Sequence, residues 1–128
     1  MNLSPQDPPR EFAVGRRRQI RMKDCGRLAL EPDEQVTLTT PAGAEYDVAR
    51  KSWGFYATPS LNGRLRGFNL RPVMIKNPAT GRFFVLLVER GREDDFRAYL
   101  DDDALTVVCW LDEDRALAGL ESRMAEFR

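Results

Sequence analysis

The stretch RPVMIKNPATGRFFVLLVE, residues 71–89, decides how this chain of 128 residues is expected to fold. Two apolar runs, 71–76 and 82–89, flank a five-residue connection that contains proline and glycine, and this arrangement predicts a β-hairpin. Residues 83–88 are apolar at every position, so we expect their strand to lie centrally in a sheet with both faces covered.

The segments on either side of this hairpin carry strand and helix patterns. Period-two alternation predicts strands around 20–22, 36–39 and 46–48, and an apolar run predicts another over 104–111. Helical spacing appears twice, in Phe96, Tyr99 and Leu100 and again in Leu117, Leu120, Met124 and Phe127. We therefore predict an α+β fold, with an antiparallel-rich sheet of about six short strands and two helices at about 92–101 and 113–127. The strand–helix–strand unit over 82–111 fits either a parallel crossover or an antiparallel return.

The length suits one domain, since single domains cluster around 100–150 residues. Residues 1–11 contain three prolines and few apolar residues, which predicts a disordered tail ahead of a single α+β domain over 12–128. The apolar stripe of the second helix is expected to pack in the core, with a protein interface as the alternative.

The composition argues against several classes of function. The chain has no histidine, which removes the Ser-His-Asp and Cys-His catalytic pairs and histidine-ligated zinc. Its two cysteines, Cys25 and Cys109, form no metal-binding motif, so we expect no metal and no cofactor. No apolar run approaches the roughly 20 residues that cross a bilayer, and no signal-peptide core is present. We expect a cytoplasmic protein without a membrane partner, for which binding is favoured over catalysis.

Charge is strongly segregated although 20 Lys+Arg balance 20 Asp+Glu. The net charge is +4 over residues 1–29, −5 over 30–49, +8 over 50–92 and −7 over 93–128. Such asymmetry either marks a charged partner or reflects opposite blocks that pair within the fold. The sequence leaves both interpretations open.

The basic block contains the best candidate binding region, residues 50–71. Its guanidinium groups can bind phosphate or carboxylate, its aromatic rings can stack on a base or sugar, and its hydroxyl groups can donate and accept hydrogen bonds. The candidate ligand-binding residues are Arg50, Lys51, Trp53, Tyr56, Thr58, Ser60, Asn62, Arg64 and Arg66. This region predicts a non-catalytic binding or accessory module for an anionic small molecule or a saccharide, such as a nucleotide-sugar. The alternative role of these residues is to close the core and pair with the acidic blocks.

Two other functions fit the same charges. The basic segment 16–23, together with Arg64 and Arg66, could bind RNA or DNA, although the neutral total charge makes nucleic acid the weaker hypothesis. An acidic last third beside a basic middle third instead favours self-association into a homo-oligomer with no small-molecule ligand.

Overall fold

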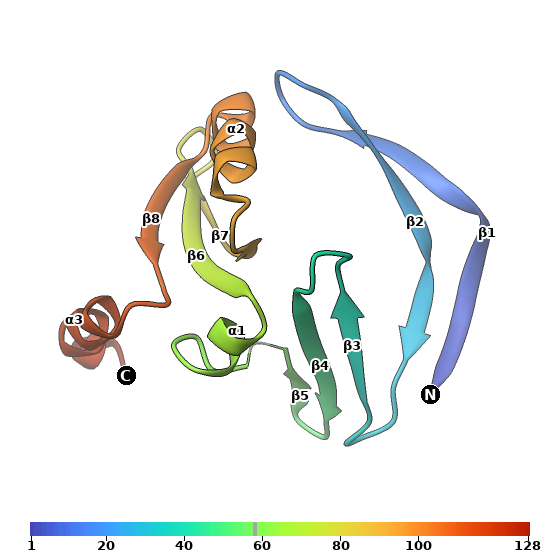
Figure 1. Cartoon of the computed structure of the whole chain (residues 1–128), viewed down its shortest axis with the longest axis horizontal. Coiled ribbons are helices and arrows are strands. Elements are labelled where there is room, and N and C mark those ends of the chain that lie inside the picture. The colour runs from blue at the N-terminus through green and yellow to red at the C-terminus, as the bar shows by residue number, and fades with distance from the viewer. Residues whose placement is uncertain (58) are drawn as a thin grey trace.

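A computed structural model of the chain describes residues 1–57 and 59–128, and every strand pairing in it is antiparallel (Figure 1). These residues form a single small domain with eight strands in three sheets and three α-helices, which confirms the α+β class. The elements in chain order are β1 (Asn2–Val14), β2 (Ile20–Ala29), β3 (Gln35–Thr39), β4 (Glu45–Lys51), β5 (Gly54–Tyr56), α1 (Arg64–Gly67), β6 (Leu70–Asn77), β7 (Arg82–Glu89), α2 (Glu93–Asp103), β8 (Thr106–Trp110), α3 (Asp114–Met124) and a 3-10 turn (Ala125–Phe127).

The hairpin predicted from residues 71–89 is confirmed as β6 and β7. The pairing runs from Leu70 opposite Glu89 to Asn77 opposite Arg82. At the turn the Asn77 carbonyl accepts a hydrogen bond of 2.8 Å from the Gly81 N–H, and Gly81 has the positive φ of 72° that glycine adopts most readily. β8 pairs antiparallel with the other side of β6, so β7 and β8 run parallel to each other, and the unit over 82–111 is a crossover in which α2 connects two parallel strands.

The prediction that residues 83–88 form a central strand is wrong, because β7 lies at the edge of the order β7-β6-β8. The central position belongs to β6, whose Val73 and Ile75 are fully buried. Phe83, Phe84 and Val85 of β7 remain 57%, 44% and 51% exposed. An uninterrupted apolar run therefore occupies a free sheet edge, where natural proteins usually place charges, prolines or bulges.

The predicted helix at 92–101 is confirmed as α2, which extends to Asp103. Its Phe96 and Leu100 pack on Val73, Ile75 and Val88, so α2 covers one face of this sheet. Three acidic residues in its first turn complement the positive end of the helix dipole, and the helix ends where Ala104 adopts a left-handed conformation.

The second predicted helix, 113–127, is divided into α3 and the 3-10 turn that follows it. The expectation that its stripe packs in the core is wrong, because no residue of α3 is buried. Leu120, Met124 and Phe127 are 41%, 45% and 73% exposed. Among the described residues, no helix is long and apolar enough to cross a membrane.

The sheet β3-β4-β5 joins the sheet β7-β6-β8 through α1. Leu65 of α1 is completely buried in a cluster with Ala44, the residue before β4, and Leu70 of β6. A main-chain hydrogen bond of 3.1 Å from Glu45 N to the Phe68 carbonyl also connects the start of β4 to the residue that follows α1. The short helix thus acts as the joint between the two sheets.

The third sheet is the hairpin of β1 and β2, which we call the arm. Residues 1–11, predicted to be a disordered tail, lie almost entirely within β1. The pairing shifts between Pro5 and Arg10, so that Pro8 and Pro9 fall in an irregular segment where no ladder hydrogen bond is required of them. In Figure 1 the arm runs along one side of the molecule and approaches the rest of the chain only near its ends.

Candidate functional site

The first two candidate residues, Arg50 and Lys51, stabilise the connection between β2 and β3. The Arg50 guanidinium donates a hydrogen bond of 2.7 Å to the Leu30 carbonyl, and Lys51 Nζ lies 2.5 Å from an Asp33 carboxylate oxygen. Both cations therefore already have partners within the chain.

Arg64 and Arg66, both in α1, also bind acidic segments of the same chain. Arg64 Nη2 lies 2.8 Å from Oδ2 of the buried Asp47, and its guanidinium stacks over the Phe68 ring at 4.9 Å. Arg66 Nη2 donates a hydrogen bond of 3.0 Å to the Asp112 carbonyl. These contacts tie α1 to β4 and to the loop before α3.

Ser60 and Asn62 hold the loop that leads into α1. Ser60 Oγ accepts a hydrogen bond of 2.6 Å from the N–H of Arg64, the first residue of α1. Asn62 Nδ2 donates one of 2.6 Å to Asp114 Oδ1 at the start of α3. Thr58, the remaining hydroxyl candidate, lies outside the described residues.

The two aromatic candidates remain exposed but do not form a common stacking surface with Phe55. Trp53 lies in the turn between β4 and β5 and is 70% exposed. Tyr56 pairs with Ala49 and Phe55 with Arg50, so adjacent residues of β5 point to opposite faces of the sheet. Several of the candidate groups thus have partners within the chain, and ligand binding at 50–71 stays a prediction.

The basic middle block also pairs with the acidic last block, around Asp112. Arg71 Nε lies 2.8 Å from Asp112 Oδ2, Arg90 Nη2 lies 3.7 Å from the same oxygen, and the Arg71 guanidinium stacks on the Trp110 ring at 4.1 Å. Burial raises the pKa of Asp112, but the hydrogen bond and charge of Arg71, aided by Arg90, lower it further, so the net shift is downward. These ion pairs therefore connect the basic block 50–92 to the acidic block 93–128.

This downward shift predicts an acid-sensitive contribution to stability. A carboxylate whose folded-state pKa is depressed stabilises the fold above its unfolded pKa of about 3.9, and the contribution disappears as the pH falls through the lower folded value. The difference in unfolding free energy between wild type and Asp112→Asn is expected to narrow between about pH 5 and pH 2. Urea unfolding across this range measures it, with Asp94→Asn at a 98% exposed side chain as the control. A constant difference would contradict the assignment.

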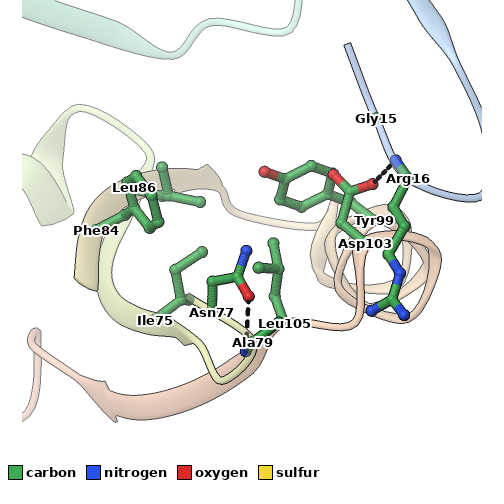
Figure 2. Close-up of a pocket in the computed structure, with 10 residues that line it drawn as sticks. All are labelled: Gly15, Arg16, Ile75, Asn77, Ala79, Phe84, Leu86, Tyr99, Asp103 and Leu105. Atoms are coloured by element: carbon green, nitrogen blue, oxygen red, sulfur yellow. Dashed lines mark hydrogen bonds between the residues drawn. The ribbon is translucent and has the colours of Figure 1, made fainter. Parts of the chain in front are cut away.

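A hollow of about 400 Å³ lies between the tip of the arm, the start of β7 and the end of α2 (Figure 2). Ile75, Leu86 and Leu105 form much of its apolar lining. The Tyr99 hydroxyl and the Asn77 amide nitrogen point into it. Burial, and then the charge of Asp103, raise the pKa of Tyr99, which keeps its hydroxyl a hydrogen-bond donor.

Two further hollows adjoin the first one along α2, one of them smaller and the other shallower. One of about 260 Å³ lies between Ile20 of the arm and Ala98 of α2, and one of about 440 Å³ runs from Leu87 to Phe96. All three share Tyr99 as a lining residue, and we call them together the α2 groove. The groove combines apolar residues with charged ones, among them Arg18, Asp95 and Asp102, and such a mixture is typical of a binding surface.

The arm presents an apolar surface next to this groove. The pairs Leu3–Leu28, Phe12–Met22 and Val14–Ile20 lie directly opposite one another, so that each pair points to one side of the arm. Residues an even number apart in β2 share a face, so the three pairs lie on one side, which we call the arm face, and the Arg10–Asp24 ion pair lies on that side between Leu3–Leu28 and Phe12–Met22. The six apolar residues are between 36% and 63% exposed. The opposite side carries Arg21, Lys23 and Arg27.

Sequence reasoning missed the arm face. The alternation of Phe12 with Val14 was available as a signal, and it continues in Ile20 and Met22 across the turn. The three prolines of residues 1–11 predict disorder instead, although β1 occupies Asn2–Val14.

The nucleic-acid hypothesis requires the segment 16–23 and α1 to share one basic face. In Figure 1 the tip of the arm lies beside α2, whereas α1 lies at the other end of the sheet β7-β6-β8. Arg64 and Arg66 are also engaged by Asp47 and Asp112. This geometry does not favour a continuous nucleic-acid surface.

Within the described part of the chain, no three His, Cys, Asp or Glu side chains are grouped to hold a metal ion. No protein-family model, curated protein or solved structure matches this chain.

Proposed function

We propose that the chain is a protein–protein interaction module that functions by self-association, rather than an enzyme or a small-molecule carrier. The observation that carries the proposal is the accessible surface of the single chain, 9507 Å². A compact monomer of 14.7 kDa exposes only about 6,900 Å² by the general scaling of surface with mass. The excess is about 2,600 Å².

This excess for one chain is about as large as the surface that each chain buries in the most extensive permanent assemblies. Obligate homodimers and other permanent complexes bury roughly 2,000–5,000 Å² in total, or roughly 1,000–2,500 Å² for each chain. The exposed surface also has the right chemistry, since it includes the arm face, the three exposed residues of β7 and the stripe of α3. Large exposed apolar patches mark interaction sites in folded proteins.

Sedimentation equilibrium of the purified chain, from about 1 to about 100 µM, tests the proposal. We expect a mass of at least twice 14.7 kDa at the upper end of this range. The assembled protein is also expected to bind little of a dye that reports exposed apolar surface. A monodisperse monomer at every concentration would overturn the self-association function.

A further inference from the structure

We propose that two copies of the chain exchange their arms, so that the arm face of each copy packs on the α2 groove and the β7 edge of the other. The inference rests on the proposed function and assigns its binding site. The acceptor is formed by α2 and β7, and the donor is the amphipathic hairpin of β1 and β2.

The arm has few contacts with its own body. Among the described residues, its hydrogen bonds and ion pairs to the rest of the chain are confined to its ends. At the tip, Arg16 N donates to Asp103 Oδ1 at 2.8 Å and Arg17 N donates to the Asp102 carbonyl at 3.2 Å. At the base, the Met1 amino group lies 2.8 Å from Glu34. An isolated two-stranded hairpin is marginally stable in water, so an arm of this length needs further packing along its apolar face.

The β7 edge needs covering for a complementary reason. Phe83, Phe84 and Val85 combine an exposed apolar surface with unpaired main-chain groups on one side of the strand. No charged residue lies between Arg82 and Glu89 to discourage pairing with another strand. Such an edge is a template for another chain, and an arm with a long apolar face is suited to cover it.

Charge makes a second copy the preferred occupant. The tip of the arm carries three consecutive arginines, residues 16–18, and α2 begins and ends with acidic clusters at 93–95 and 101–103. One chain therefore supplies both halves of a complementary contact, and two copies can make it twice. The few tip contacts now made within one chain can form equally between chains, which is the usual basis of arm exchange.

A pair of matched arm variants tests the donor side. Met22→Glu adds a negative charge to the arm face, whereas Ala13→Glu adds the same charge to the other side, opposite Arg21. We expect Met22→Glu to raise the dimer dissociation constant at least ~100-fold and Ala13→Glu to leave it nearly unchanged. Val14→Glu is the second variant on the arm face, and circular dichroism verifies that each variant is folded.

Mixing two defective variants tests the exchange itself. Phe84→Glu damages the acceptor but leaves the arm intact, so Met22→Glu and Phe84→Glu chains are each expected to be monomeric. When they are mixed, one intact arm meets one intact acceptor, and a mixed dimer should re-form with one of its two contacts. If mixing restores nothing, or if the dimer ignores Met22→Glu, arm exchange is overturned while self-association stands. A wild-type monomer at all concentrations would overturn both.

Discussion

Replacing Asp112 with alanine is expected to lower the free energy of unfolding by about 3 kcal/mol. The Asp112 side chain is only 6% exposed and that of Arg71 is 21% exposed, so removing the carboxylate leaves a partly buried guanidinium without its partner. Arg90 loses the same partner, and its Nε is already buried without a hydrogen-bond acceptor. Urea denaturation at fixed protein concentration measures the loss, since self-association makes apparent stability depend on concentration.

Two further variants separate the ion pair from general effects of the substitution. Asp94→Ala removes a carboxylate whose side chain is 98% exposed and whose partner Arg97 is also exposed, so its cost should stay below about 1 kcal/mol. The double variant Arg71→Ala/Asp112→Ala should cost clearly less than the two single changes added together, because it leaves no stranded charge on Arg71. Additive costs would mean that the two groups do not depend on each other.

The sequence predicted those parts of the fold whose pattern is local. The hairpin of β6 and β7 and the helix α2 follow from turn residues and apolar spacing within a few positions. The place of β7 in the sheet does not follow from such a pattern. The apolar run at 83–88 predicts that other residues pack on both faces of this strand. The same pattern arises whether those residues come from this chain or from a second copy.

The internal partners of the arginines in the candidate region 50–71 could not be predicted, for a related reason. Composition shows that Arg64 and Arg71 carry charge, but their partners are Asp47 and Asp112, and the pairing of segments so far apart depends on the tertiary fold. An anion-binding site and a set of internal ion pairs both require arginines at these positions. Only the contacts of each guanidinium distinguish them.

The arm illustrates a conflict between composition and pattern. Three prolines in 1–11 indicate disorder, while Phe12 with Val14 and Ile20 with Met22 indicate a strand pair. The strand forms despite the prolines because the register shifts between Pro5 and Arg10. Residues of β1 pair with β2 on either side of this shift, and Pro8 and Pro9 lie within it. Prolines within such an irregularity do not cost the ladder a hydrogen bond.

Leu65→Ala is expected to destabilise the chain by about 3 kcal/mol, the usual cost of deleting a fully buried leucine side chain. Leu65 has no exposed surface and packs against Ala44, the residue before β4, and Leu70 of β6. The resulting cavity would therefore open at the joint between two sheets that few other contacts hold together. Hydrogen exchange should accelerate in β3 and β4 before it does in β6, because β6 keeps its packing against α2.

The matched control for this variant is Leu38→Ala in β3. Leu38 is 56% exposed, so the same deletion there removes little buried surface and should cost under about 1 kcal/mol. Equal losses at Leu38 and Leu65 would show that α1 is not the joint. A large loss at Leu65 with uniform exchange throughout the chain would show that the two sheets unfold as one unit. The expected combination, a large loss and faster exchange confined to β3 and β4, would place the weakest internal boundary of the chain at α1.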